Sequence, residues 1–377
     1  MAGNFVQLHN HTHYSLLDGA SKVPDLVKRV KELGMPAVGI TDHGNMHGAY
    51  ELWRAAVDSG VKPIIGIEAY VTPETARQDK TRVSWDTNWT PVPGHARNPD
   101  DVSGGGLITH LTMWAENDEG LVNLIKASSV ANLEGRVMRY PRMDKEVLST
   151  YSKGVIASSG CPSGIIQTRL RLGQFDEALR AAGEFQDIFG KDNFYIELMD
   201  HGLSIESKVT GDLLTIAKKL GAPLLATNDS HYVMEADKDA QDAMLCINSG
   251  ATLDDPNRFK FEGSGYYIKS AEEMRELFKD HPDACDNTLE IAERCNVIFD
   301  DHEDGAFMPQ FDCPEGWDET SLFLKKVEEG LEKRYDGNPP MEVLKQADYE
   351  CGVICQMQFC GYFLVVADYI NWAKEHG

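Results

Sequence analysis

The stretch near the N-terminus holds an unusual density of side chains that bind metal ions. His9, His11 and His13 alternate with other residues, and Asp18 follows within the next few positions. On a β-strand, side chains two residues apart point to the same face, so His9 and His11 would present two imidazoles side by side. Imidazoles and carboxylates together suit Zn, Mn or Fe ions. The spacing therefore predicts a metal site, with histidines satisfied in a polar loop as the alternative.

Further ligand-type side chains lie at or near the ends of predicted strands. With the first stretch they form a set of nine, namely His9, His11, Asp18, His43, Glu68, His110, Cys161, Asp229 and His231. One catalytic zinc ion takes about three protein ligands, so nine indicate two or three ions, with Glu68 as a bridging carboxylate. Such clusters hydrolyse phosphate esters, because two ions about 3.5–4 Å apart bind the attacking and the leaving oxygen and activate a water. We expect all nine to be catalytic through the bound metals.

The elements that must position these side chains alternate between short β-branched runs and amphipathic helices, which predicts an α/β fold with parallel strands. The predicted strands span residues 5–11, 36–41, 63–71, 107–114, 154–159, 194–199 and 222–227. The predicted helices between them span residues 23–33, 48–59, 119–132, 175–189 and 205–220. A barrel gathers the ends of all its strands around one mouth, whereas an open sheet gathers ligands mainly at one switch point. The spread of the ligands therefore favours a (β/α)7 barrel.

The segment from Pro73 to Gly106 interrupts this alternation with Lys, Arg, Trp, Pro and Gly. We expect a long loop near the barrel mouth that holds single-stranded nucleic acid through phosphate contacts and stacking, with a solvated surface loop as the alternative. The predicted substrate contacts are His13, His201, Lys80, Arg82 and Arg97.

The composition is typical of a soluble globular protein, with 42% hydrophobic and 25% charged residues among 377. We expect no membrane span, because no run of about 18 apolar residues occurs, and no secretory leader follows Met1. Eight cysteines without a compact framework indicate a reducing, cytoplasmic location. The net charge of −24 alone argues against nucleic acid binding, but bound divalent cations would reverse the sign of a carboxylate-rich cleft.

The texture of the sequence changes after His231. A capping box at Ser270 opens a helix, and further helices are expected at residues 287–295, 318–335 and from 341 onward. We place a domain boundary around residue 285. The apolar and aromatic ending has little left in the chain to pack against, so we expect a fragment of a longer protein.

With these residues assembled, the chain resembles the PHP (polymerase and histidinol phosphatase) superfamily. The matching motifs are His9-x-His11, Thr41-Asp42-His43-Gly44, Glu68-Ala69-Tyr70 and Asn228-Asp229-Ser230-His231. Apart from the Pro73–Gly106 insert, the whole chain is similar to the N-terminal region of the alpha subunits of bacterial DNA polymerase III, the C-family replicative polymerases. The most specific parts of this likeness are residues 8–19 and the ending at residues 361–369.

The resemblance implies a distorted (β/α)7 TIM-like barrel, the PHP fold, over residues 1–285, followed by the mainly helical beginning of the polymerase palm over residues 286–377. It also implies three divalent ions, Zn and/or Mn with Mg or Fe as further options, and the thiolate of Cys161 favours Zn for one of them. The ligand sets carried over are His9, His11, Glu68 and Asp229 for the first ion, Glu68, His110 and Cys161 for the second, and Asp18, His43 and His231 for the third.

In family members with a complete ligand set, the domain resembles a metal-dependent 3′–5′ exonuclease that proofreads DNA by hydrolysing its 3′-terminal phosphodiester with metal-activated water. The parent chain would be a DNA-directed DNA polymerase, a nucleotidyltransferase whose own active site lies outside this sequence. The implied partners are the single-stranded or frayed 3′ end of DNA, the remaining polymerase domains, a sliding clamp and other replisome subunits. Two alternatives stay open: a catalytically silent metal-binding domain that supports the polymerase, and a PHP phosphatase for a small molecule.

Overall fold

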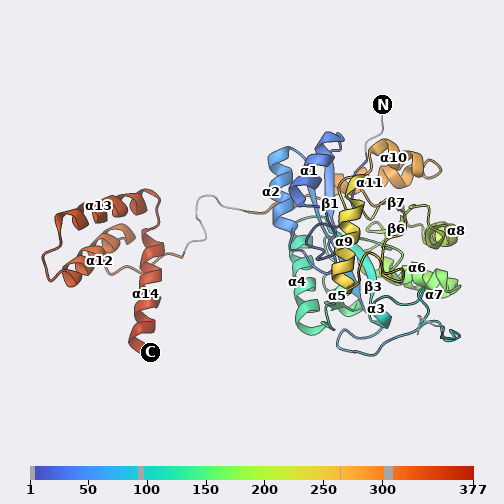
Figure 1. Cartoon of the computed structure of the whole chain (residues 1–377), viewed down its shortest axis with the longest axis horizontal. Helices are drawn as coiled ribbons and strands as arrows, with labels where there is room; N and C mark the ends of the chain where they lie inside the picture. Colours follow the sequence, from blue (N-terminus) through green and yellow to red (C-terminus); the bar gives the residue numbers. More distant parts are fainter. Residues whose placement is uncertain (1–4, 92–96, 264, 301–308) are drawn as a thin grey trace. The chain divides into compact units, whose positions relative to one another are not determined.

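The structure is a computed structural model that describes residues 5–91, 97–263, 265–300 and 309–377. The chain divides into two compact units, Met1–Phe299 and Asp300–Gly377. Strands and helices alternate in the first unit, and helices form the described part of the second (Figure 1).

A seven-stranded sheet forms the centre of the first unit (Figure 1). Its strands are β1 (Ala37–Ile40), β2 (Lys62–Val71), β3 (Thr109–Ala115), β4 (Arg142–Met143), β5 (Val155–Ser158), β6 (Phe194–Leu198) and β7 (Leu224–Ala226). Neighbouring strands follow the order β1-β2-β3-β5-β6-β7, and β4 pairs with β2 off this path. Six of these strands coincide with predicted ones, whereas the two residues of β4 are too few to carry a pattern.

The strand directions differ in part from the prediction. The pairs β1–β2, β5–β6 and β6–β7 are parallel as expected, but β3 runs antiparallel to both β2 and β5. The reason lies in the connection from β2 to β3, whose described residues hold only the four-residue helix α3 (Ser103–Gly106) in place of a crossover helix. The α/β fold class is confirmed as a curled, mixed sheet. The reversal brings the beginning of β3 to the edge where its neighbours end, which we call the mouth.

The first predicted strand, residues 5–11, is instead an extended segment with a bend at His9 and single bridges to its neighbours. On one side the amide of Gly39 donates to the carbonyl of Gln7 at 2.8 Å. On the other side the amide of His11 donates to the carbonyl of Ser230 at 2.8 Å, beyond the end of β7. This segment therefore links the two edges of the curled sheet.

Helices cover the outside of the sheet, and in Figure 1 α1, α2 and α4 lie on one side of the strands while α6, α7 and α8 lie on the other. Apolar stripes explain their placement, since α1 buries Leu26, Val27 and Val30 against the core. The five helices predicted between the strands coincide with α1, α2, α4, α7 and α8. The bounds are α1 (Val23–Glu32), α2 (Ala49–Ser59), α4 (Asp118–Glu134), α5 (Lys145–Thr150), α6 (Ile165–Arg171), α7 (Phe175–Phe189), α8 (Ser204–Leu220), a 3-10 helix η1 (Glu235–Asp237), α9 (Lys238–Ser249), α10 (Ala271–Leu277) and α11 (Pro282–Arg294).

The interior of the curled sheet is divided into two layers along the strands. The apolar layer consists of Val6, Leu8, Ala37, Ile64, Trp114, Ile156, Tyr195 and Leu225, and Ile291, Ala292 and Cys295 of α11 pack against it. The polar layer lies two or four residues nearer the mouth on the same strands and consists of the buried residues Glu68, Thr112, Ser158, Glu197 and Thr227. Alternate side chains of a strand point to the same face of the sheet, so each strand contributes inward-facing residues to both layers.

The second unit holds α12 (Glu319–Arg334), α13 (Met341–Gln356) and α14 (Cys360–His376) around a small core. That core consists of Leu322, Phe323, Cys351, Cys360 and Leu364. The predicted boundary near residue 285 falls inside α11, which packs on β7, so the first compact unit continues to Phe299. The assignment of the two parts to a PHP domain and a palm stays a prediction. Among the described residues, no single helix is long and apolar enough to span a membrane, although the bent pair α13 and α14 meets these criteria together.

Candidate metal centre

The structure brings all nine predicted ligands together at the mouth. The extended N-terminal segment and the loop that follows it supply His9, His11 and Asp18. The loops after β1, β5 and β7 supply His43, Cys161, Asp229 and His231, and β2 and β3 supply Glu68 and His110. His110 reaches the mouth because β3 begins there, which is the functional consequence of its reversed direction.

Glu68 lies at the centre of this cluster and is 1% exposed. Its Oε2 atom is 2.6 Å from Nδ1 of His43 and 3.0 Å from Nδ1 of His110. Its Oε1 atom is 3.4 Å from Nε2 of His9. A carboxylate with imidazoles around both oxygens has the position that a bridging ligand requires.

Asp229 is a second carboxylate close to the Nε2 atoms of His9 and His11. Its Oδ1 atom lies 3.1 Å from Nε2 of His11 and 3.4 Å from Nε2 of His9. The backbone of Asp229 has a φ of +44°, a left-handed conformation that is costly for a residue other than glycine. The next residue holds it in place, since the amide of Ser230 donates to the carbonyl of His9 at 3.1 Å. The left-handed backbone of Asp229 is thus tied to the segment that carries His9 and His11.

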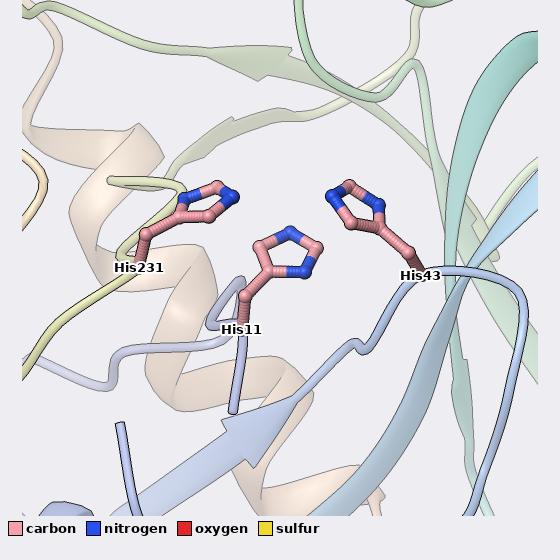
Figure 2. A group of neighbouring side chains, drawn as sticks. All are labelled: His11, His43 and His231. Atoms are coloured by element: carbon pink, nitrogen blue, oxygen red, sulfur yellow. The ribbon is translucent and has the colours of Figure 1, made fainter. Parts of the chain in front are cut away.

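Figure 2 shows the rings of His11, His43 and His231, with His11 between the other two. The ring centre of His11 is 4.1 Å from that of His43 and 4.3 Å from that of His231. Asp18 faces the outer pair, with its carboxylate oxygens 2.9 Å from Nε2 of His43 and 3.9 Å from Nε2 of His231. Cys161 completes the set, its sulfur 3.4 Å from Nδ1 of His110.

A buried carboxylate that was not among the predicted site residues fixes the orientation of His9. Glu197, in the polar layer on β6, lies 2.7 Å from Nδ1 of His9 through its Oε1 atom. The hydroxyls of Ser158 and Thr227 each donate to Glu197 at 2.5 Å. This contact favours a proton on Nδ1, which would leave Nε2 of His9 as the nitrogen that binds a metal ion. A glutamate at an inward-facing position of an otherwise apolar strand is the sequence signal for this role.

His11 is oriented in the same way by a hydroxyl. Its Nδ1 atom is 2.9 Å from the hydroxyl of Ser15, which donates to Asp42 at 2.6 Å. The amide and hydroxyl of Thr12 also donate to Asp42, at 2.7 and 2.8 Å. Burial raises the pKa of Asp42, while these hydrogen bonds oppose that rise. Asp42 precedes the predicted ligand His43 in the sequence, yet its side chain supports His11 through Ser15.

The charges in the cluster shift the proton affinities of its members in opposite directions. Burial lowers the pKa of His11 to about 3, and the neighbouring His43 and His231 add to this effect. Burial opposes protonation of His9, but the carboxylates of Glu197 and Asp229 raise its pKa well above the usual value. His11 is therefore neutral near pH 7 and has a free lone pair, as a metal ligand needs.

Burial and neighbouring charges also shift the pKa values of Glu68 and Cys161. Burial alone would raise the pKa of Glu68, yet His110 and His43 hold it well below its usual range. Burial raises the pKa of Cys161 well above that of a free thiol, and the carboxylates of Glu68 and Asp229 raise it further. A divalent cation would relieve this repulsion and favour the thiolate.

The donor set fits divalent cations. Several buried ligand atoms have no hydrogen-bond partner within the described residues: Nε2 of His9, His11 and His231, Oδ1 of Asp18 and Asp229, and both oxygens of Glu68. Unpaired buried polar atoms cost free energy, and a bound cation would satisfy them. Three groups have ligand atoms within 4.8 Å of one another, namely His9, His11 and Asp229; His43, Glu68 and His110; and His11, His43 and His231. The first group contains three of the four ligands predicted for one ion and lacks Glu68, whereas the other two combine the ligands differently. The number and identity of the ions stay predictions.

His201, a predicted substrate contact, lines the cavity that contains six of the nine ligands. Both of its ring nitrogens are engaged, at 2.6 Å from Oε1 of Glu206 and 2.9 Å from the carbonyl of Asn228. Its ring stacks on Tyr266 at 4.1 Å. The contacts of His201 therefore support the loop that carries Asp229, and its predicted contact with substrate remains untested.

Two of the three predicted substrate contacts in the Pro73–Gly106 insert donate to the backbone of the insert itself. Arg82 donates to the carbonyl of Gly105 at 2.8 Å, and Arg97 donates to that of Val83 at 3.0 Å. Lys80 is exposed. None of the three is among the described residues that line the two cavities containing ligands. Their role as substrate contacts, like that of His13, stays a prediction.

An aromatic anchor holds the insert to the barrel. Trp85 is 9% exposed, and the guanidinium of Arg169 in α6 lies 3.8 Å from the centre of its ring. Asp101 accepts the amides of Trp85 and Asp86 at 3.0 and 3.2 Å. These specific contacts hold the described part of the insert in place, whereas a solvated surface loop would not need them.

Comparison with known proteins identifies two family models along the chain. The PHP domain matches residues 7–201, and the bacterial DNA polymerase III alpha NTPase domain matches residues 321–377. The chain is 50% identical over 375 residues to the DNA polymerase III subunit alpha of Mycobacterium leprae, covering 99% of this chain and 31% of that protein. It is 40% identical over 374 residues to the corresponding subunit of Treponema pallidum, covering 99% and 30%. The chain thus spans about a third of the length of these relatives.

A solved structure described as a metal-dependent phosphoesterase, from Bifidobacterium adolescentis, matches with a TM-score of 0.34 and 16% identity. The match covers 61% of this chain and 88% of that one.

Proposed function

The chain belongs to the PHP domain family, and on that basis we propose that its mouth is the active site of a metal-dependent 3′–5′ exonuclease acting on DNA. The observation that carries the proposal is the convergence of nine ligand-type side chains from separate segments, several of whose buried atoms form no hydrogen bond within the described residues. Six of the nine line one cavity. Buried polar groups without partners are expensive, and they cluster where a ligand is to be bound.

The reaction follows from the chemistry of these donors. Divalent ions held by the nine residues would polarise the phosphoryl oxygens and lower the pKa of a bound water, so no nucleophilic side chain is needed. Glu197 and Ser15 hold the imidazoles of His9 and His11 with one nitrogen facing the mouth. Glu68 lies between the histidines and would be shared between ions. The protein's part is to fix the ligands and to bind the strand.

DNA is the proposed substrate because the relatives that match the whole chain are subunits of a DNA polymerase. Removal of a mismatched 3′ nucleotide is the hydrolytic reaction that such an enzyme needs beside synthesis. For the longer protein we propose polymerase activity, a cytoplasmic location, and a sliding clamp and other replisome subunits as partners.

The test is digestion of a single-stranded oligonucleotide labelled at its 5′ end, in Mn²⁺ or Zn²⁺, by the chain and by His11→Ala and Asp18→Asn variants. We expect the wild type to shorten the strand one nucleotide at a time from the 3′ end, and a chelator to stop it. Both variants, purified identically, should lose the activity while their circular dichroism is unchanged. Equal digestion by wild type and variants would identify a contaminating nuclease and overturn the proposal.

The same preparation separates the alternatives. A silent structural domain would bind metal yet leave both paired and mismatched 3′ ends intact. A phosphatase for a small molecule would release phosphate from a monoester and spare the internal diesters of the oligonucleotide. Shortening from the 3′ end, faster at a mismatched end, is the result expected only of the proofreading exonuclease.

A further inference from the structure

Two cavities meet at the proposed metal centre, and both are lined by Asp18 and His43. The first, the aromatic cavity, has a volume of about 590 Å³, and the second, the basic cavity, has a volume of about 350 Å³. Their linings are otherwise unlike. A substrate bound over Asp18 and His43 would therefore extend into two different environments.

The aromatic cavity is walled by Phe259, Phe261 and Tyr266 from the segment that follows α9. Phe261 stands edge-on to the ligand His231 with ring centres 4.6 Å apart, and it contacts Tyr266 at 4.7 Å. Phe259 lies 5.9 Å from Phe261 and is 62% exposed, although it borders a cluster of charged groups. Exposed aromatic rings beside a polar site are typical of surfaces on which a planar ligand stacks.

The basic cavity has a different character. Arg136 and Arg139, from the loop between α4 and β4, line it together with His47. One nitrogen of Arg139 donates to Asn248 at 2.5 Å, and Nε of Arg136 contacts the carbonyl of Met138 at 3.4 Å. The guanidinium of Arg139 also lies 5.3 Å from the ring centre of Tyr140. Each guanidinium has five N–H donors, more than these contacts use.

Asp18 is the only carboxylate among the described residues that line the basic cavity. The chain as a whole carries a charge of −24, so two arginines facing one cavity beside the metal centre are a local exception. Guanidinium groups bind phosphate oxygens through paired hydrogen bonds.

From these two linings we propose how the strand lies, a proposal that rests on the exonuclease function given above. The 3′-terminal base stacks in the aromatic cavity against Phe259 and Phe261. The phosphates of the preceding nucleotides contact Arg136 and Arg139, and the bond to be cleaved lies over Asp18 and His43 between the two cavities. A base offers its flat face to the aromatic wall without regard to sequence, as removal of any mismatched nucleotide requires.

The first test uses Phe259, because its exposed side chain can be removed without opening the core. Wild type, Phe259→Ala and Phe259→Trp are compared on two single strands, one with an ordinary 3′ nucleotide and one with a 3′-terminal abasic tetrahydrofuran unit. We expect Phe259→Ala to raise KM about tenfold on the ordinary end and to leave the abasic end unchanged, since loss of stacking requires a base. Phe259→Trp should restore the wild-type KM.

The second test concerns the arginines. Arg136→Gln and Arg139→Gln should each weaken the binding of both strands to the same extent. Each should also reduce the slope of log KM against the logarithm of the salt concentration by about 0.7, the value for one lost phosphate contact on a single strand. Lys219→Gln, exposed on α8 and absent from the linings of both cavities, is the control and should leave the salt dependence unchanged.

The outcomes separate this proposal from the proposed function. If wild type digests neither strand, the exonuclease function fails. If wild type digests both strands but Phe259→Ala affects them equally, or the arginine variants keep the wild-type salt dependence, the placement of the strand is wrong while the function stands. A larger loss in Phe259→Ala on the abasic end would likewise contradict stacking of the terminal base on Phe259.

Discussion

The same strands build both layers inside the curled sheet, yet the buried polar atoms of the two layers differ in whether they have hydrogen-bond partners. In the apolar layer, Trp114 is fully buried and even its ring nitrogen is satisfied, donating to the carbonyl of Leu8 at 3.1 Å. In the polar layer and the mouth above it, residues equally buried, such as His9 and Glu68, keep atoms without partners. A shift of a few residues along a strand thus separates a packed core from a set of unpartnered ligands.

The apolar layer and the mouth therefore contribute differently to the stability of the fold and to the binding of metal ions. The apolar layer lowers the free energy of the folded chain by burial, whereas the mouth stores unfavourable free energy that a bound cation would recover. Changes in the two layers should therefore have different signatures, and the following variants are ordered by the expected size of the effect.

Trp114→Ala should have the largest effect, a loss of about 3–5 kcal/mol in the free energy of unfolding, because it leaves a cavity in the apolar layer. Denaturation with guanidinium, followed by circular dichroism under a chelator, measures this. Leu133→Ala on α4, where the side chain is 85% exposed, is the control and should change stability by less than about 0.5 kcal/mol. Equal effects of the two variants would contradict the assignment of the apolar layer.

Glu68→Gln should change hydrolysis strongly and stability little. Loss of the central carboxylate should lower hydrolysis at least about a hundredfold, or about 2.7 kcal/mol, because its two oxygens face three imidazoles. Under a chelator, the denaturation midpoint of Glu68→Gln should stay close to that of the wild type, since the shape of the side chain is kept. A variant that unfolds as readily as Trp114→Ala would show that the mouth also carries the stability of the barrel.

Glu197→Gln should have an intermediate effect, because this residue orients His9 without facing the mouth. Loss of its charge should weaken metal binding about 10- to 100-fold, a typical cost of removing the partner of a ligating histidine. Titration with Zn²⁺ against a competing chelator measures the affinity. An affinity equal to the wild type would mean that the contact of Glu197 with His9 does not orient the ring.

Lys269 gives the smallest effect, and the size of this effect depends on pH. Its ammonium is buried beside the mouth, donates to Oδ1 of Asn228 at 2.6 Å and to the carbonyl of Gly265, and burial lowers its pKa to about 8. Between pH 8 and the ordinary value of about 10.5, the unfolded chain keeps a proton that the folded chain has lost, so raising the pH stabilises the fold.

The stability of the wild type relative to Lys269→Met should therefore be constant below pH 8 and rise by on the order of 1 kcal/mol between pH 8 and 10.5. Denaturation curves of both chains at several pH values measure this difference. A relative stability that is flat across the range would show that Lys269 is solvated.

Much of the fold was predictable because periodicity reports which face of an element is buried. The stripe of Leu26, Val27 and Val30 and the β-branched run of β2 each identify an element correctly. Periodicity carries no direction, however, so it could not reveal that β3 is reversed. It also missed the bend at His9, which lets both Leu8 and His9 face the interior where a regular strand would alternate them.

The residues of the candidate site also fall into those that the sequence predicts and those that only the fold reveals. Ligand-type residues are visible in a sequence, and the nine predicted ligands could be identified because histidines and carboxylates recur at strand ends. The residues that support them, such as Ser15 and Glu197, look like ordinary polar residues until the fold brings them within hydrogen-bond distance. Arg139 and Phe259 escaped notice because cavities depend on how distant loops fold together.

The central claim is that the mouth binds divalent cations, and the metal content of the purified chain after dialysis tests it most directly. Elemental mass spectrometry should be applied to the wild type, Glu68→Gln and His13→Ala, because His13 shares the first segment but belongs to none of the three close groups of ligand atoms. We predict more than one bound divalent ion per chain in wild type and His13→Ala, and a clear loss in Glu68→Gln. Background metal in the wild type, or an unchanged content in Glu68→Gln, would contradict the claim.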